Sequence, residues 1–230
     1  MSPRPHPTVH LVRHGQSAAN AGLATSDNAL IPLTPLGEQQ ALWMAEALGV
    51  AAPQVIVSSY LRAQQTAAPF CAQQGLSAQV QALLHEFVTL DPASVAGTTN
   101  VQRAPLVQAY WDACDPDLRH GPGAETFREL SERVAAVEDT LPALAPDTVV
   151  FGHGLWFALL IWRQLGFTQV DTATMRAFRQ FQLALPMPNC AVYHLHGNLV
   201  TAPRWQVQAN EALIRRMSAP LTERVPTPAP

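Results

Sequence analysis

The sequence predicts an α/β fold in which a mainly parallel sheet is covered by helices on both faces. Short apolar segments typical of buried strands recur along the chain, and most are followed by a polar loop and a helical pattern. Such repeated units favour parallel strands, because parallel neighbours need a crossover connection between them. A chain of 230 residues, 48% of them hydrophobic, is also long enough to bury a sizeable core.

The first expected unit is a strand followed by a capped helix. Thr8–Val12 is a short β-branched and apolar stretch that ends at a polar, glycine-containing turn, and we expect it to be the central strand. Thr34 supplies an N-cap and Pro35 a first-turn proline for a helix that ends at Gly49.

A second strand and helix follow directly. Gln54–Val57 is again short and apolar, as a buried strand would be. Ser58 and Ser59 offer capping oxygens to a helix that begins near Tyr60. Pro69 lies within this helical pattern, where a proline kinks or breaks a helix.

A long polar region separates the two halves of the chain. It runs from Phe87 to Gly123, after a weaker strand at Ala78–Val80, and contains one helical pattern with Val107 and Tyr110 on its apolar side. We interpret residues 87–123 as an insertion that covers a site and selects the substrate.

The second half repeats the alternation and then ends in a hairpin. The expected segments are a helix at Glu125–Leu144, a strand at Thr148–Phe151, a helix at Gly154–Leu165, and strands at Ala191–Leu195 and Leu199–Ala202. We expect residues 1–218 to form a single domain. Residues 219–230 are rich in proline and are predicted to be disordered.

Composition excludes several classes of partner. The formal charge of −3 gives no broad positive field for nucleic acid or anionic lipid. The longest apolar run, near Leu155–Trp162, is far shorter than the roughly 20 residues of a membrane span. The three cysteines are widely spaced, and the amino terminus carries no pattern of a signal peptide, so we expect a cytoplasmic protein. The sequence does not determine the oligomeric state and leaves a homodimer open.

Reactive side chains are expected at the carboxyl ends of three strands, where the loops of an open parallel sheet share one crevice. These loops read Arg13-His14-Gly15-Gln16-Ser17, Ser58-Ser59-Tyr60-Leu61-Arg62 and Gly152-His153-Gly154. Glu86 follows the weaker third strand and is able to join them. Two arginines and two histidines should therefore meet at one end of the sheet.

This group suits phosphoryl transfer without a metal or another cofactor. A neutral imidazole such as that of His14 is a nucleophile near neutral pH and can carry phosphate on nitrogen. The guanidinium groups of Arg13 and Arg62 match phosphate oxygens in pairs, and His153 adds a donor. Glu86 is suited to protonating the departing oxygen and then activating water.

Neighbouring residues leave some of these roles open. His85 precedes Glu86, and either side chain could be the acid. Gly15 and Gly154 lack side chains, so the backbone can approach a phosphate there, and Gly154 also begins a helix whose amide groups favour an anion.

The set of motifs resembles the histidine phosphatase superfamily, also called the phosphoglycerate mutase-like family, from about Val9 to Leu195. RHGQS stands where that family has its R-H-G signature. The other matches follow in family order: LTPLGEQQA at 33–41, SSYLRAQQTA at 58–67, Glu86, GAETF at 123–127 and GHG at 152–154.

The resemblance implies a three-layer α/β/α sandwich with a mostly parallel central sheet. It implies that His14 is phosphorylated, that Arg13, Arg62 and His153 bind the phosphoryl group, and that Glu86 donates the proton. By the same resemblance, Asn20 also reaches the phosphate and Ser17 is a nearby polar contact. The expected activity is hydrolysis of a phosphomonoester, with a small phosphorylated metabolite as the substrate.

Three alternatives stay open at this stage. The first is a phosphoglycerate mutase-like phosphotransferase, which is disfavoured because the family's glycolytic mutases carry W-N and F-x-G-W-x-D stretches and lysine-bearing segments. This chain reads Ala18-Ala19-Asn20-Ala21-Gly22 at that place and contains no lysine. The second is a phosphate-binding module without turnover. The third is a metallohydrolase built on His85, His120, His153, His194 and His196, whose spacing fits no known ligand pattern.

Overall fold

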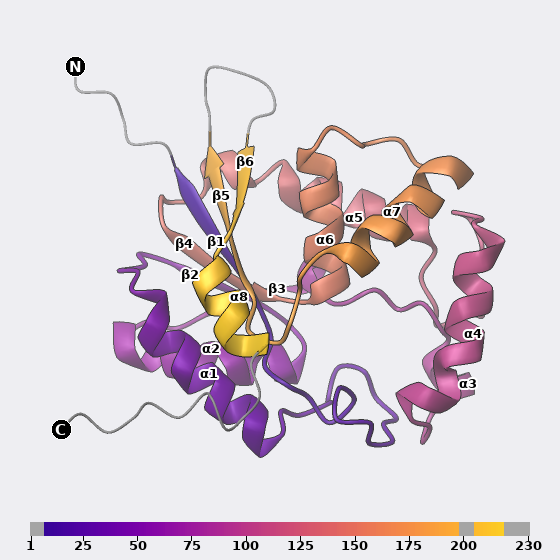
Figure 1. Cartoon of the computed structure of the whole chain (residues 1–230), viewed down its shortest axis with the longest axis horizontal. Helices are drawn as coiled ribbons and strands as arrows, with labels where there is room; N and C mark the ends of the chain where they lie inside the picture. Colours follow the sequence, from indigo (N-terminus) through magenta and orange to yellow (C-terminus); the bar gives the residue numbers. More distant parts are fainter. Residues whose placement is uncertain (1–6, 198–204, 219–230) are drawn as a thin grey trace.

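The computed structural model describes residues 7–197 and 205–218, and it contains one six-stranded sheet in the order β3-β2-β4-β1-β5-β6 (Figure 1). The strands are β1 (Thr8–Arg13), β2 (Val55–Ser58), β3 (Gln79–Gln81), β4 (Thr148–Gly152), β5 (Val192–Gly197) and β6 (Trp205–Ala209). The first four strands pair in parallel, whereas β5 is antiparallel to both of its neighbours. The prediction of a mostly parallel sheet with an interior first strand is confirmed.

Helices cover both faces of this sheet, as a three-layer sandwich requires. On one face lie α1 (Pro35–Leu48), α2 (Leu61–Gln74) and α8 (Glu211–Ser218). On the other face lie α5 (Phe127–Glu138) and α6 (Gly154–Gln164), with α7 (Thr172–Ala184) packed against α6. Successive strand residues alternate between the two cores, so Leu11 packs with α6 while Val12 packs with α1 and α2.

The boundaries of α1 follow from its first and last residues. The Thr34 hydroxyl accepts the Gly37 N–H at 3.1 Å, and Pro35 occupies the first turn, where its missing N–H costs nothing. Gly49 ends the helix with a left-handed φ of 61°. These start and stop signals were readable in the sequence, and the predicted helix is confirmed.

The predicted start of α2 near Tyr60 is confirmed, because the helix begins at Leu61, whereas the predicted serine caps are wrong. Its N-cap is Tyr60, whose side chain makes no capping hydrogen bond. The Ser58 hydroxyl instead accepts the N–H of Tyr60 at 3.3 Å, and Tyr60 is the residue before the first helical position. Pro69 does not break the helix, which continues to Gln74.

The insertion contains α3 (Pro92–Val95) and α4 (Asn100–Ala113), and both lie beside the sandwich rather than on the sheet (Figure 1). Tyr110 and Trp111 on α4 are buried, and the Trp111 ring contacts those of Phe127 and Phe178. The aromatic side chains of α4 therefore anchor the insertion to α5 and α7.

The end of the chain departs from the prediction in two ways. The strand expected at Leu199–Ala202 lies outside the described residues, and the partner of β5 is β6. Helix α7 was not predicted, because only Met175 and Phe178 on it are fully buried and the apolar pattern is correspondingly sparse. Its N-cap is Asp171, whose carboxylate accepts the Thr174 N–H at 2.7 Å.

Two histidines face each other across β1 and β5. His10 and His194 are register partners, and their Nδ1 atoms lie 2.7 Å apart, so one ring donates and the other accepts. His10 Nε2 also lies 3.3 Å from the Asp147 carboxylate. Burial lowers the pKa of His10, and burial together with His10 lowers the pKa of His194 to about 4. The neutral forms are favoured because a second proton would remove the acceptor.

Acidification from pH 7 to pH 5 is expected to lower the free energy of unfolding. Four imidazoles have lowered pKa values in the folded chain, namely His10, His14, His153 and His194, whereas the unfolded chain takes up protons near 6.5. Below pH 6.5 the unfolded state thus binds more protons, and stability falls as the pH decreases. One imidazole that stays neutral at pH 5 accounts for about 2 kcal/mol of this loss. Urea unfolding at both pH values measures it, and equal stabilities would contradict the prediction.

Candidate active site

The segments that follow β1, β2 and β4 bring His14, Arg62 and His153 into contact, with Arg62 in the first turn of α2. The centroids of the two imidazole rings are 5.2 Å apart with an interplanar angle of 61°. The Arg62 Nε donates to His14 Nε2 at 3.2 Å. All three residues are nearly inaccessible, with exposed fractions of 4%, 7% and 0% for His14, Arg62 and His153. Side chains separated by up to 139 positions therefore meet, because β1, β4 and β2 are parallel and end at the same edge of the sheet.

His14 has the geometry of a neutral nucleophile. Its Nδ1 lies 2.7 Å from the Gly15 carbonyl oxygen, which has no proton to give, so Nδ1 is the donor. The lone pair is then on Nε2, the atom that faces Arg62. Burial, reinforced by Arg62 and Arg13, holds the pKa of His14 well below its usual value. The imidazole is consequently unprotonated and nucleophilic at neutral pH.

The two arginines are fixed by backbone carbonyls. Arg62 donates from Nη1 to the Asn28 oxygen at 2.7 Å, and its guanidinium lies 4.8 Å from the centroid of the Tyr60 ring. Arg13 donates from Nη1 to the Met187 oxygen, and its buried Nε has no hydrogen-bond partner among the described residues. Burial lowers the pKa of both groups, yet guanidinium groups remain charged. Two immobilised cations therefore flank His14.

Gly154 gives Arg13 its place at the start of α6. A Cβ atom at Gly154 would lie 3.1 Å from Arg13 Nε and 3.3 Å from its Cδ. The glycine thus makes room for a guanidinium, and the helix amides that follow it, those of Leu155 and Trp156, bind the Glu86 carboxyl group.

Gly15 is needed for packing between backbones. A Cβ atom there would lie 2.5 Å from the Gly37 oxygen, and a Cβ atom at Gly37 would lie 2.0 Å from the Gln16 oxygen. The loop after β1 therefore rests directly on the first turn of α1. The Gly15 N–H is bound by the Thr66 hydroxyl at 2.9 Å, which further fixes the backbone beside His14.

Glu86 is held at the N-terminus of α6. Its two carboxyl oxygens accept the N–H groups of Leu155 and Trp156, each at 3.1 Å, and that of Phe87 at 2.9 Å. Together with Arg13 it lines a cavity of about 320 Å³ between α6 and the end of α7. His85 instead donates from Nδ1 to the Ala82 oxygen at 2.8 Å, with its ring 5.9 Å from that of Tyr60. Of the two candidate acids, Glu86 is the one that shares a cavity with Arg13.

Ser17 and Asn20 are linked to each other and to a residue that sequence reasoning missed. The buried Ser17 hydroxyl donates to Asn20 Oδ1 at 3.1 Å. Asn189 donates from Nδ2 to the same oxygen at 3.0 Å and to the His14 carbonyl at 3.1 Å. These contacts orient the Asn20 amide through its oxygen. No motif marked Asn189, because only the turn before β5 brings it to the β1 loop.

The histidines of the metallohydrolase alternative are not brought together as a ligand set. Within residues 7–197 and 205–218, no three His, Cys, Asp or Glu side chains are grouped as a metal site would need. His194 and His196 lie beside His10 on the sheet, whereas His153 lies against His14. Over the same ranges, no helix has both the length and the apolar character of a membrane span.

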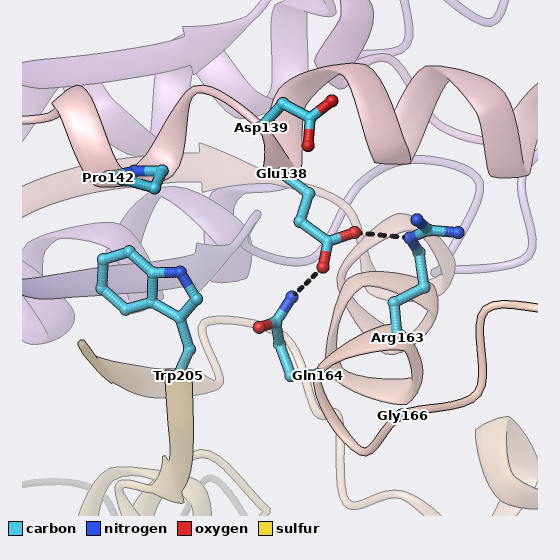
Figure 2. A pocket seen from close by; sticks show the side chains of 7 residues that line it. All are labelled: Glu138, Asp139, Pro142, Arg163, Gln164, Gly166 and Trp205. Atoms are coloured by element: carbon cyan, nitrogen blue, oxygen red, sulfur yellow. Dashed lines mark hydrogen bonds and ion pairs between the residues drawn. The ribbon is translucent and has the colours of Figure 1, made fainter. Parts of the chain in front are cut away.

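A second cavity, of about 350 Å³, lies at the opposite end of α6 (Figure 2). Glu138 there pairs with Arg163 at 2.6 Å and accepts from Gln164 at 2.7 Å, while Trp205 forms the facing wall. Gln164 follows Gly154 by ten positions, which places this cavity about 15 Å along the helix from Gly154. The cavity lies between the ends of α5 and α6, and none of the candidate site residues lines it.

Comparison with known proteins gives matches over most of the chain. The model of the histidine phosphatase superfamily, branch 1, matches residues 9–202. A probable phosphoglycerate mutase GpmB from Citrobacter koseri is 29% identical over 210 residues, which cover 87% of this chain and 90% of that protein. A shorter stretch of 81 residues, 34% of this chain, is 40% identical to PE_PGRS11 of Mycobacterium tuberculosis and spans 14% of that protein.

Solved structures share the fold. A mycobacterial glucosyl-3-phosphoglycerate phosphatase in complex with VO3 superposes with a TM-score of 0.66 and 24% identity, over 88% of this chain and 98% of that one. A mutant phosphoserine phosphatase from Entamoeba histolytica, in complex with phosphoserine, has a TM-score of 0.65 and 17% identity, over 90% and 98% of the two chains. At these identities the likeness concerns the fold, and it agrees with the three-layer sandwich described above.

Proposed function

This chain belongs to the histidine phosphatase superfamily, branch 1, and on that premise we propose that it is a metal-independent phosphomonoester hydrolase that works through a phosphohistidine on His14. The observation that carries the proposal is the state of His14. Its imidazole is buried, neutral and tautomerically fixed, and its Nε2 lone pair faces the Arg62 guanidinium. Phosphatases among the proteins of the same fold support hydrolysis as the reaction.

The first half-reaction forms the N–P bond. The Nε2 lone pair of His14 attacks phosphorus while the bond from phosphorus to the departing alkoxide oxygen breaks. The fixed cations Arg13 and Arg62 compensate the charge on the equatorial phosphate oxygens. Glu86, which lines a cavity together with Arg13, transfers its proton to the departing oxygen and becomes a carboxylate.

The second half-reaction restores the enzyme. The Glu86 carboxylate takes a proton from a water molecule as the water oxygen attacks phosphorus, and the N–P bond breaks. Inorganic phosphate leaves, His14 regains its lone pair and Glu86 is protonated again. Each residue thus returns to its starting state, and no metal ion enters either step.

A mutase activity is the second candidate, because a relative that matches 87% of this chain is a probable phosphoglycerate mutase. A mutase would return the phosphoryl group to another hydroxyl instead of water. The absence of lysine and the sequence Ala18-Ala19-Asn20-Ala21-Gly22 favour hydrolysis. An intact His14 and Glu86 argue against a phosphate-binding module without turnover.

Two assays with chelator present test the proposal. The first measures phosphate release from an aryl phosphate, and the second measures interconversion of 2- and 3-phosphoglycerate. We expect phosphate release that survives chelation. Loss of hydrolysis upon chelation would overturn the metal-independent mechanism, and isomerisation faster than phosphate release would establish the mutase instead.

The substrate is proposed to be a small phosphorylated metabolite that reaches from the crevice towards the insertion. A cavity of about 360 Å³ lies there, and Asn28, whose carbonyl accepts from Arg62, lines it together with Phe87. Arg103 lines the same cavity and is braced by Thr98 and Thr25 through Nε and Nη2, so its Nη1 end is the part left for a ligand. Arg119 is instead committed to the Ala124 carbonyl and the Glu129 carboxylate.

Arg103→Met is expected to weaken selectivity for substrates that carry a second anionic group. Losing one charge-assisted contact should raise KM for such substrates about tenfold, with kcat/KM for an aryl phosphate nearly unchanged. The matched variant Arg119→Met should leave the ratio between the two substrate classes as it is. Equal ratios for wild type and Arg103→Met across a metabolite panel would contradict the role of Arg103.

A further inference from the structure

Ser58 and His153 form a hydrogen-bonded pair that is completely enclosed. The Ser58 Oγ and His153 Nε2 atoms are 2.8 Å apart, and both residues have an exposed fraction of 0%. The His153 ring makes T-shaped contacts with the rings of His14 and Tyr60, each with a centroid separation of 5.2 Å. The opposite ring nitrogen, Nδ1, is buried and has no hydrogen-bond partner in the described part of the chain.

The surrounding contacts decide which atom of this pair donates. Ser58 Oγ already accepts the Tyr60 N–H at 3.3 Å. If His153 Nε2 also donated to Oγ, the Ser58 hydroxyl proton would face no acceptor in a buried position. If the hydroxyl donates to Nε2, both Ser58 bonds are satisfied and the ring proton resides on Nδ1. In this second arrangement, His153 Nδ1 is a buried N–H donor beside His14, whereas in the first arrangement it would carry a buried lone pair.

We propose that Ser58 is a positioning residue that holds His153 in the Nδ1–H tautomer, so that Nδ1 donates a hydrogen bond to the phosphoryl group during transfer. The proposal rests on the proposed function, since the acceptor is the phosphoryl group on its way to His14. A lone pair at this position would repel the phosphoryl oxygens, whereas an N–H group stabilises their charge. Ser58 acts through His153 and does not need to touch the substrate.

The neutral state of His153 is consistent with this arrangement. Burial, followed by Arg62, His14 and Arg13, holds the pKa of His153 well below its usual value. A neutral ring carries one proton, so the identity of the donor nitrogen is decided by a neighbour. Ser58 is that neighbour, because no other hydrogen-bond partner of the ring is present in the described residues.

The decisive measurement is the tautomer of His153 in the resting protein, read by long-range ¹H–¹⁵N NMR on histidine-labelled chain. The His153 signals are assigned by their loss in His153→Gln. We expect a pyrrole-like Nδ1 and a pyridine-like Nε2 in wild type, and a mixture of tautomers in Ser58→Ala. Wild-type protein with the proton on Nε2 would overturn the proposal, and this reading requires no activity, so it is separate from a failure of the proposed function.

Kinetics of the same variant supply the second readout. Ser58→Ala is expected to lower kcat/KM about 10- to 100-fold, mostly through kcat, with urea unfolding used to verify that the variant is folded. Ser59→Ala, which removes the neighbouring hydroxyl, should leave both the His153 tautomer and kcat/KM unchanged. An unaltered tautomer in a folded Ser58→Ala variant would overturn the role of Ser58, and if that variant does not fold, the wild-type spectrum decides.

Discussion

Replacing His14 with asparagine is expected to lower kcat for phosphomonoester hydrolysis by at least about 1,000-fold. The asparagine amide can still donate to the Gly15 carbonyl in place of Nδ1, so the loop geometry is retained. No nucleophilic lone pair would then face Arg62, and the two-step route is lost. Initial rates of aryl phosphate hydrolysis for wild type and His14→Asn measure the effect.

The intermediate itself provides a second test of His14. Rapid quenching of wild type during turnover should trap phosphate on the protein in an alkali-stable, acid-labile form, as a P–N bond requires. His14→Asn should trap none. The variant His196→Asn, which alters a histidine bound to Thr8 and Gln208 on the sheet, is the matched control and should retain the intermediate. Hydrolysis by His14→Asn within tenfold of wild type would refute the nucleophile.

The sequence was sufficient where one local signal determines one feature. The Thr34 cap and the Gly49 stop bracket α1, and short apolar runs between polar loops mark β1, β2 and β4. Because parallel strands end at the same edge, the residues after them could be expected to meet. In the structure, the rings of His14 and His153 are in contact, as this argument predicts.

Features that depend on distant partners could not be predicted in this way. Asn189 acts through the turn before β5, and its neighbours His14 and Asn20 are more than 160 positions away. Ser58 resembled a helix cap, yet its hydroxyl is hydrogen-bonded to His153. A local sequence pattern cannot show this contact, because the two residues are 95 positions apart. Helix α7 was missed because its buried side is narrow and packs on α6 instead of the sheet. Tertiary contacts decided all three outcomes.

Glu86→Gln is expected to separate substrates by the basicity of their leaving groups. An alkyl phosphate releases a strongly basic alkoxide that needs a proton, so kcat/KM should fall about 100- to 10,000-fold. A nitrophenyl phosphate releases a weakly basic phenolate and should lose much less in this first step. The slope of log kcat/KM against the leaving-group pKa should therefore be steeper for the variant than for wild type.

The matched variant His85→Gln decides between the two candidate acids. His85 lies against the Tyr60 ring and the Ala82 carbonyl, whereas Glu86 shares a cavity with Arg13. If Glu86 is the proton donor, His85→Gln keeps the wild-type slope. Glutamine at position 86 can still accept the Phe87 and Trp156 N–H groups through its oxygen, although its amide would oppose the Leu155 N–H. A uniform loss across all leaving groups would therefore indicate a disturbed start of α6, and a steeper slope in His85→Gln alone would move the acid to His85.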